Sequence, residues 1–267
     1  MTPATMAPDA AFRAEYAAHR ASEGRGYAGE ALLALPYLTR GAHARQWAVR
    51  ARSFDAFMRR VIRPAVRAGE RPRVLDLGAG NGWLAYRVSG AGADATAVDL
   101  RDDAVDGLAA GAPLAARAPF HRVAATFGAL PLRDGSYDVA LFNASLHYAM
   151  DLPAVLREAA RVVRPGGRLV VLDSPFYAAS RDGERMVAEK RREGETRFGE
   201  RAATLLAMPC VEYLTGARLA DASVGLGLTW HRRRVRYPLW YELRGALAFL
   251  RGRRAPSRFD LWESIVP

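Results

Sequence analysis

An apolar segment of this chain carries an acidic residue, Asp76, near its end and runs directly into three glycines at alternate positions, Gly78, Gly80 and Gly82. The apolar residues of 73–77 predict a short buried strand. Glycine permits the positive φ values of a tight strand-to-helix turn and removes the Cβ atoms that would hold a ligand off the backbone. The segment therefore predicts a strand, a glycine loop and a helix, with a ligand bound on the loop.

Beyond this loop, short apolar stretches alternate with helical patterns. Apolar Val155, Leu156 and Ala159 recur at helical spacing, and Pro165-Gly166-Gly167 ends that helix. The expected elements are, in order, strand 73–77, helix 83–90, strand 94–99, helix 101–110, strand 120–125, strand 137–143, helix 153–163 and strand 168–173. This alternation predicts a parallel sheet covered on both faces, the doubly wound α/β arrangement. Ligands of such sheets bind beyond the carboxyl ends of the strands.

The flanks set the expected domain organisation. Residues 1–70 are Ala- and Arg-rich with helical patterning and predict an N-terminal cap, which precedes a core at 71–177. A charged stretch at 178–212 predicts a helical insert or lid after the fifth strand. Residues 213–267 are expected to return to the sheet as helix 213–224, strand 228–235, a helical insert at 238–254 and strand 258–266, which makes seven strands in all.

Composition limits the class of protein. A chain of 267 residues with 50% hydrophobic residues can bury a substantial core, and we expect one large domain with decorations. The chain has no uninterrupted apolar run long enough to predict a transmembrane helix. Its first residues lack the pattern of a secretory signal, and none is expected. The single cysteine, Cys210, cannot form an internal disulfide, so a cytoplasmic location is expected. The histidines form no ligand spacing with Cys210, and no metal site is expected.

The net charge of +11 raises the question of a nucleic-acid partner. Nearly all of the basic residues are arginine, with Lys190 the only lysine, and coding composition alone can produce such a bias. The basic clusters lie on or beside expected helices and strands, where a solvated face would also carry charge. From the charge, we therefore do not expect a nucleic-acid partner.

The order of residues from Asp76 to Gly82 resembles the first motif of the class I S-adenosylmethionine-dependent methyltransferases, which have a Rossmann-like fold. Further stretches extend this resemblance over roughly residues 70 to 177. It implies that the cofactor is S-adenosylmethionine, converted to S-adenosylhomocysteine, and that Asp76 orders the loop and the ammonium end. The methionine part would then face Gly78, Ala79, Gly80 and Asn81.

The same resemblance assigns residues at the ends of later strands. Asp99 closes the second strand and can bind both ribose hydroxyls, while Asp102 and Asp103 are better placed to cap the next helix. Leu100 would lie against the adenine. Thr126 stands where many relatives carry an Asp that binds the adenine amino group, and its hydroxyl can still accept a hydrogen bond. Phe127 would offer its backbone N–H to the purine, and Asn143 completes the cofactor residues.

The loop after the fourth strand is where the methyl group would meet its acceptor. His147 is the candidate general base, because an imidazole accepts protons near neutrality, although related chains also carry a packing histidine here. Base-modifying amino-methyltransferases typically show Asn or Asp, then Pro-Pro and an aromatic residue, where this chain has Asn143-Ala144-Ser145-Leu146. A small organic acceptor, methylated at oxygen, nitrogen or carbon, is therefore expected.

Other functions remain open at this stage. An RNA- or protein-directed methyltransferase and a non-catalytic protein of the same fold are alternatives, as is a nicotinamide-cofactor binder, although bulky Trp83 occupies the place where that fingerprint needs close helix packing. The segment 238–254 combines aromatic and apolar residues with terminal arginines. It predicts either a packing helix or a peripheral contact with a membrane surface.

Overall fold

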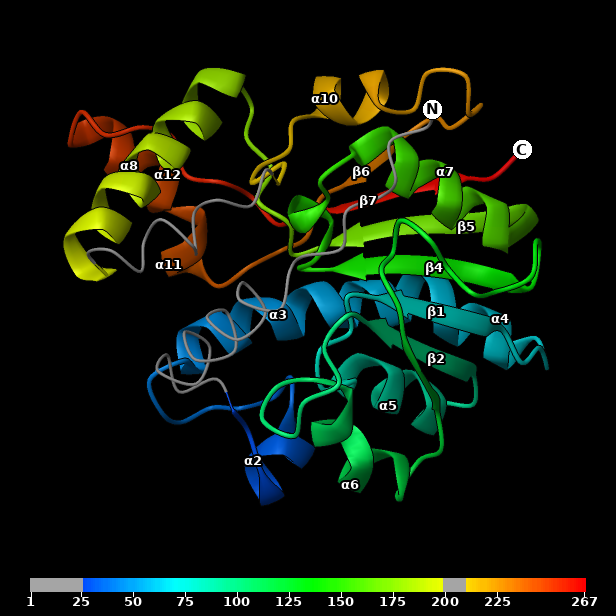
Figure 1. Cartoon of the computed structure of the whole chain (residues 1–267). Coiled ribbons are helices and arrows are strands. Elements are labelled where there is room, and N and C mark those ends of the chain that lie inside the picture. The colour runs from blue at the N-terminus through cyan, green and yellow to red at the C-terminus, as the bar shows by residue number, and fades with distance from the viewer. Residues whose placement is uncertain (1–25, 199–209) are drawn as a thin grey trace.

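A computed structural model describes residues 26–198 and 210–267 of the chain. Seven strands form one sheet in the order β3-β2-β1-β4-β5-β7-β6 (Figure 1). Strands β1 to β5 pair in parallel, whereas β7 is antiparallel to both β5 and β6. The strands are β1 (Arg73–Leu77), β2 (Asp94–Asp99), β3 (His121–Ala124), β4 (Tyr137–Asn143), β5 (Val163–Leu172), β6 (His231–Arg233) and β7 (Leu261–Ile265).

Helices connect the strands and cover the sheet (Figure 1). The segment before β1 contains a helix that begins as α3 and continues through a π-helical turn, η1, into α4. The helical elements are α2 (Gly29–Ala34), α3 (Ala44–Phe57), η1 (Met58–Ile62), α4 (Arg63–Arg67), α5 (Trp83–Gly90), η2 (Leu108–Gly111), α6 (Ala112–Ala115), η3 (Leu146–Tyr148), α7 (Leu152–Val162), α8 (Ser180–Phe198), α10 (Gly216–Asp221), α11 (Leu239–Glu242) and α12 (Arg244–Leu250).

Alternate residues of each central strand enter opposite faces of the sheet, because successive side chains of a strand point to opposite sides. Val74 and Leu141 belong to a core that also contains buried residues of α2, α3 and α5. Their neighbours Leu75 and Phe142 belong to a second core, which contains the apolar residues of α7 and Leu219 of α10. The sheet is therefore covered on both faces, as the alternation of apolar strands and helices predicts.

An aromatic cluster joins the helix before the sheet to the helix after the glycine loop. The indole of Trp83, the first residue of α5, packs edge-on against Trp47 with ring centroids 5.6 Å apart and against Phe54 at 5.4 Å. All three side chains are buried. Trp83 therefore holds α3 against the start of α5 and fixes where α3 crosses the sheet.

The structure confirms most of the expected elements. Four of the expected ranges, 73–77, 83–90, 94–99 and 137–143, coincide with β1, α5, β2 and β4. Of the expected cap and insert, residues 1–25 and 199–209 lie outside the described part of the chain, and α8 occupies most of the remaining insert.

The helix expected at 101–110 is wrong. Only 108–111 is helical there, as the short 3-10 turn η2. The carboxylate of Asp103 accepts the backbone N–H groups of Val105 and Asp106, both at 3.0 Å. Aspartate side chains that bind the backbone in this way compete with helical hydrogen bonds, which explains the turn.

Three further boundaries differ from the sequence expectation. Strand β5 begins at Val163, which pairs with Tyr137, so Pro165-Gly166-Gly167 lies within the strand after α7 has ended at Val162. Strands β6 and β7 are shorter than expected. The carboxylate of Asp260 accepts the backbone N–H of Val235 at 3.0 Å, and this side-chain bond replaces strand pairing beyond the two strand ends.

We predict that Trp83→Ala lowers the free energy of unfolding by about 3–5 kcal/mol, because it leaves a cavity between α3 and α5. Urea denaturation followed by circular dichroism measures this change. The matched control is Trp240→Ala, since Trp240 is 40% exposed and its loss is expected to cost about 1 kcal/mol or less. Equal losses for the two variants would contradict the assigned role of Trp83.

Candidate functional site

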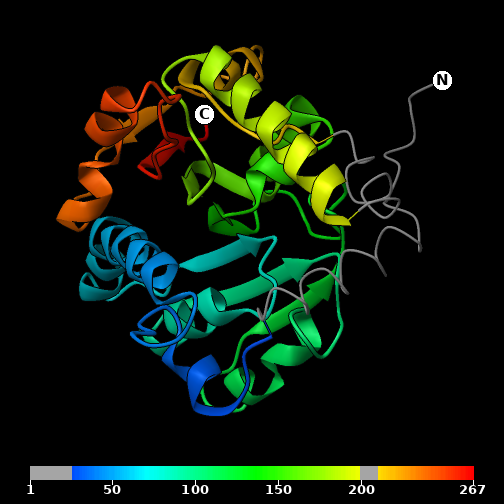
Figure 2. The ribbon, with the colours of Figure 1, turned by 90° about the vertical axis from the view of Figure 1, so that its left-hand side faces the viewer.

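Polar side chains gather where the parallel strands end. Asp76 lies near the end of β1, Asp99 and Asn143 are the last residues of β2 and β4, and Asp173 follows β5. Figure 2 faces this edge of the sheet, and α3, α8, α11 and α12 stand around it. A doubly wound sheet places its ligand at this edge. A cavity of about 310 Å³ beside Arg71 lies at the opposite edge, away from these side chains.

The glycine loop is fastened to the end of β2. The backbone N–H groups of Gly78 and Ala79 both donate to the carbonyl of Val98, at 2.8 and 3.0 Å, and the N–H of Gly80 donates to the carboxylate of Asp99 at 2.7 Å. The Ala79 side chain in this loop is buried. The structure thus brings together the residues that the sequence singles out at 78–80 and at Asp99.

Two of the three glycines are needed by the protein's own packing. A Cβ at Gly78 would lie 2.4 Å from Cβ of Ser145, and one at Gly82 would lie 2.8 Å from the ring of Phe120. Both residues also have φ values in the left-handed region. The sequence reasoning explained the glycines by a tight turn and by the approach of a ligand, and it missed the close packing of the loop against Ser145 and Phe120.

Asp99 is held in place by two backbone donors. Its carboxylate accepts the N–H of Gly80 and, at 2.9 Å, that of Arg101. Burial raises the pKa of Asp99, whereas these hydrogen bonds act in the opposite direction. Each carboxylate oxygen can accept more than one hydrogen bond, so Asp99 keeps acceptor capacity for hydroxyl groups of a ligand.

Asp76 is a buried carboxyl group whose two oxygens have no hydrogen-bond partner among the described residues. Burial, reinforced by the negative charge of Asp99, raises the pKa of Asp76 to about 7. Asn143 lies at the end of β4, two strands from Asp99 in the sheet. Its side-chain oxygen is also buried without a partner in the described ranges. Orphaned acceptors are costly in a protein interior. Their position fits a bound cationic or N–H-bearing group.

The other expected cofactor residues lie around this centre. Asn81 is buried, and its side-chain oxygen accepts the N–H of Trp83 at 3.2 Å, so it closes the turn that leads into α5. The ring of Phe127 packs edge-on against Phe142 with centroids 5.9 Å apart. Leu100 and Thr126 are half-buried, next in sequence to Asp99 and Phe127. Leu100, Thr126 and Phe127 can each present surface to a ligand bound at the loop.

Helix α3 contributes residues that sequence reasoning missed. The Arg50 guanidinium reaches Asp173 with 3.6 Å between Nε and Oδ2, and it lies over the ring of Trp47 at 4.7 Å. The Ser53 hydroxyl donates to Asp173 at 2.5 Å and lies 2.8 Å from the hydroxyl of Tyr237. Burial raises the pKa of Asp173 to about 6, and Arg50 opposes this shift. An acidic residue at the end of a strand was a usable signal for Asp173.

His147 lies in η3, just after the end of β4, beside a cavity of about 300 Å³. Its Nδ1 is 3.5 Å from the hydroxyl of Ser174, and its ring packs on Tyr148 with centroids 4.2 Å apart. Burial, together with the charges of Lys190 and Arg50, lowers the pKa of His147 to about 3. The imidazole is therefore neutral at physiological pH. The cavity is lined by His147, Tyr148, Pro175, Tyr177, Met186, Lys190, Cys210, Glu212 and Ser257.

The polar end of this cavity is an ion pair between α8 and Glu212, the last residue of the expected insert. Lys190 Nζ lies 3.7 Å from Glu212 Oε2, and the Glu212 side chain is only 8% exposed. Glu212 is tied to the same loop as His147, because its backbone N–H donates to the carbonyl of His147 at 2.8 Å. Glu212 Oε2 has no hydrogen-bond partner in the described part of the chain. Sequence patterns gave no signal for Glu212.

No group of three or more His, Cys, Asp or Glu side chains within 26–198 and 210–267 is arranged to hold a metal ion. None of the helices in these ranges combines the length and the apolar character that crossing a membrane requires.

The sequence is similar to known methyltransferases. Residues 75–171 match the family model described as methyltransferase domain. A demethylmenaquinone methyltransferase of Mycolicibacterium paratuberculosis is 32% identical over 209 residues, which cover 76% of this chain and 85% of that protein. The corresponding enzyme of Mycolicibacterium vanbaalenii is 41% identical over 119 residues, 45% of this chain and 49% of that relative. The chain thus spans about half the length of this second relative in that match.

A solved structure shares the fold over nearly the whole chain. The geranyl diphosphate C-methyltransferase of Streptomyces coelicolor, solved with Mg²⁺, geranyl diphosphate and S-adenosyl-L-homocysteine, has a TM-score of 0.60 at 15% identity. The match covers 98% of this chain and 100% of the other. At this level of identity the likeness concerns the fold.

The raised pKa of Asp76 predicts a pH-dependent stability. An unfolded Asp titrates near about 3.9, so the folded protein binds this proton more tightly, and the resulting stabilisation is lost as the pH rises through about 7. We expect the Asp76→Asn variant, which cannot ionise, to gain about 1 kcal/mol or more of unfolding free energy relative to the wild type between pH 5 and pH 8.

Chemical denaturation without added ligand at the two pH values measures this difference. Asp102→Asn removes an exposed carboxyl by the same change and serves as the control, with a small effect expected at both pH values. A constant difference between Asp76→Asn and wild type would show that Asp76 is ionised throughout.

Proposed function

The chain belongs to the class I S-adenosylmethionine-dependent methyltransferases, and we propose that it transfers the methyl group of this cofactor to an oxygen, nitrogen or carbon atom of a small organic acceptor. The observation that carries the proposal is the orphaned, buried carboxyl of Asp76 beside the glycine loop. A cationic ligand would supply the partner that this group lacks. The nicotinamide alternative is set aside, since the family is shown by a relative matched over 85% of its length.

The residues at the ends of β1, β2 and β4 divide the cofactor between them. Asp76 would pair with the ammonium of the methionine part, and the carboxylate of Asp99 would accept hydrogen bonds from the ribose hydroxyls. S-adenosylmethionine, when bound, supplies an electrophilic methyl group on a positively charged sulfur. The proposed cofactor residues are Asp76, Gly78, Ala79, Gly80, Asn81, Asp99, Leu100, Thr126, Phe127 and Asn143.

We place the acceptor in the cavity beside His147. Its volume of about 300 Å³ is at the lower end of the range for small-molecule sites. Helix α8 contributes Met186 and Lys190 to its wall, which supports a covering role for the insert that begins at 178. The relatives named above act on demethylmenaquinone and geranyl diphosphate, both small organic molecules. These two compound classes are the first to screen as acceptors.

His147 is proposed to accept the proton when the acceptor is a hydroxyl or an amine. Its lowered pKa leaves the imidazole lone pair free at neutral pH, although it also makes the residue a weak base. The buried Glu212 carboxylate on the same cavity wall can accept a hydrogen bond from the acceptor and orient it. Holding the two reactants in line supplies much of the acceleration in such a displacement.

Partners and location follow from the same reasoning. We propose that nucleic acid is not the acceptor, because the loop at Asn143-Ala144-Ser145-Leu146 lacks the pattern of base-modifying enzymes. The single cysteine, half-buried in the cavity wall, supports a cytoplasmic location. We propose that 71–177 is the cofactor-binding unit, that 213–267 completes the core sheet, and that the cap and the insert at 178–212 enclose the acceptor.

We predict that Asp99→Ala weakens binding of S-adenosylhomocysteine by about tenfold or more, because two charge-assisted hydrogen bonds to the ribose are lost. Isothermal titration of the purified protein measures the affinity. Asp102→Ala, the same change at an exposed position three residues along the chain, is expected to leave the affinity unaltered. Unchanged binding by the Asp99 variant would remove this residue from the site, and absence of binding by the wild type would overturn the proposed function.

We predict that His147→Gln lowers kcat by about a hundredfold while the affinity for the cofactor stays the same. The pKa of His147 is lowered to about 3, so His147 stays neutral when the pH falls through 6.5. The wild-type kcat should therefore show no decline near pH 6.5 that is absent from the variant. Methyl transfer to the acceptor found by screening is measured from pH 5 to pH 9. His231→Gln, at an exposed position of β6, is the control. Near-normal turnover of the His147 variant would make His147 a packing residue.

A further inference from the structure

Helices α11 and α12 carry most of the exposed apolar surface in the described part of the chain. Six of the eleven large apolar side chains exposed within 26–198 and 210–267 lie between residues 239 and 250. Phe249 is 84% exposed, Leu250 78% and Leu239 72%, and no residue of α12 is buried. The remaining three are Trp240, Leu243 and Leu247. Clustered apolar exposure of this kind marks an interaction surface.

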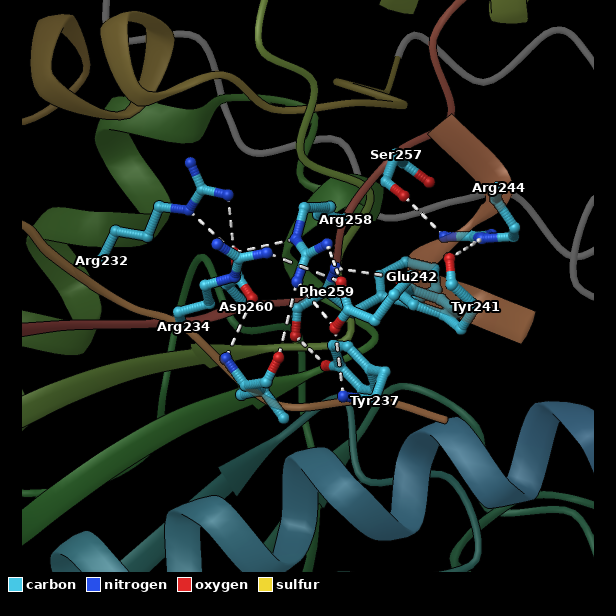
Figure 3. A network of polar contacts seen from close by, with 11 residues as sticks. Arg232, Arg234, Tyr237, Tyr241, Glu242, Arg244, Ser257, Arg258, Phe259 and Asp260 are labelled. Atoms are coloured by element: carbon cyan, nitrogen blue, oxygen red, sulfur yellow. Dashed lines mark hydrogen bonds and ion pairs between the residues drawn. The ribbon is translucent and has the colours of Figure 1, made fainter. Parts of the chain in front are cut away.

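The inner side of this helix pair is firmly attached to the protein. Arg258, which leads into β7, donates to the carboxylate of Glu242 at 2.8 Å (Figure 3). The guanidinium of Arg244 lies 3.6 Å from the centroid of the Tyr241 ring and donates to the carbonyl of Ser257 at 2.9 Å. The outer apolar residues therefore face away from the core on an anchored support, and their exposure follows from the position of the helices.

Positive charge borders the apolar residues. Arg251 and Arg253 follow α12 directly and are exposed, and among the described residues neither takes part in an ion pair. Arg45, from the start of α3, lies over the ring of Trp240 at 5.9 Å. An exposed tryptophan, bulky apolar residues and arginines in one short segment are typical of helices that lie in the interface of an anionic membrane.

We propose that α11, α12 and the following residues to Arg253 form a docking surface for an anionic lipid bilayer, with Phe249 and Leu250 inserted among the lipids and Arg251 and Arg253 on the headgroups. A second copy of the chain fits this surface less well. A two-fold contact would place the arginines of both copies together, in a chain whose net charge is already +11. A bilayer with negative headgroups instead matches both the apolar residues and their basic border.

The docking surface adjoins the cavity beside His147. Ser257, whose carbonyl binds Arg244 of α12, lines that cavity. Arg254, next to the basic border, donates to the hydroxyl of Tyr177, another cavity residue, at 3.2 Å. Docking would therefore bring the acceptor cavity close to the membrane, within reach of a lipophilic molecule. The proposal goes beyond methyl transfer and does not depend on it.

Vesicle flotation of the full chain without cofactor tests the proposal. We expect binding to vesicles of phosphatidylglycerol and phosphatidylcholine and much weaker binding to phosphatidylcholine alone. The double variant Phe249→Ser, Leu250→Ser should bind the vesicles about tenfold or more weakly, since it lacks the two apolar side chains that insert among the lipids. Arg251→Gln with Arg253→Gln should weaken binding to the anionic vesicles by about fivefold for each arginine.

Matched controls separate docking from general stickiness and from misfolding. Val224→Ser changes an apolar residue that is 81% exposed on another part of the surface, and it should bind vesicles like the wild type. Thermal unfolding of all variants should match the wild type, because the replaced side chains are exposed.

Two outcomes overturn the proposal. One is a wild type that does not float with anionic vesicles, or a serine variant that floats equally well. The other is a wild-type dimer in light scattering that the serine variant loses, which would assign the surface to a second copy. Cofactor titration is a separate measurement, so loss of vesicle binding would leave the methyltransferase proposal standing, and failed cofactor binding would leave the docking surface standing.

Discussion

The junction between the ends of β1 and β2 is the constraint on which the site depends. The glycine loop turns back so tightly that its amides bind the carbonyl of Val98 and the carboxylate of Asp99. Gly78 packs on Ser145 from β4's loop, and Gly82 packs on Phe120 ahead of β3. The carboxyl ends of β1, β2 and β4 are therefore brought to one place by a loop that admits no Cβ at two positions. The carboxyl edge is preformed because the packing of the protein itself needs it.

A single arginine influences the charge states of the proposed cofactor residues and of the residues near the acceptor cavity. Arg50 comes from α3, ahead of the sheet, and its positive charge lowers the pKa of Asp76, of Asp173 and of His147. A nearby cation favours ionised carboxyls and neutral imidazoles. It thus favours the carboxylate that a cationic cofactor needs and the neutral base that a proton-releasing acceptor needs. Burial opposes the effect of Arg50 on the pKa of the two carboxyls and reinforces its effect on the pKa of His147.

Much of the fold could be predicted because the central strands are short, apolar and bounded by turn residues. The ranges 73–77, 94–99 and 137–143 coincide with strands of the structure. Prediction was wrong at 101–110, where the Asp103 side chain binds the backbone instead of allowing a helix to continue. The resemblance assigned cofactor residues to strand ends, and Asp76, Asp99 and Asn143 lie along one edge of the sheet.

The sequence by itself determined the glycine loop, the positions of the strand ends and so the edge that a ligand would use, because these follow from local periodicity and backbone preference. Only the tertiary structure decided which distant groups meet there. Ser53 contacts Asp173 across 120 positions and Tyr237 across 184. It also decided that α12 buries no residue and leaves its apolar side chains exposed. Contacts between remote segments depend on how helices pack over the sheet, and no local pattern encodes that packing.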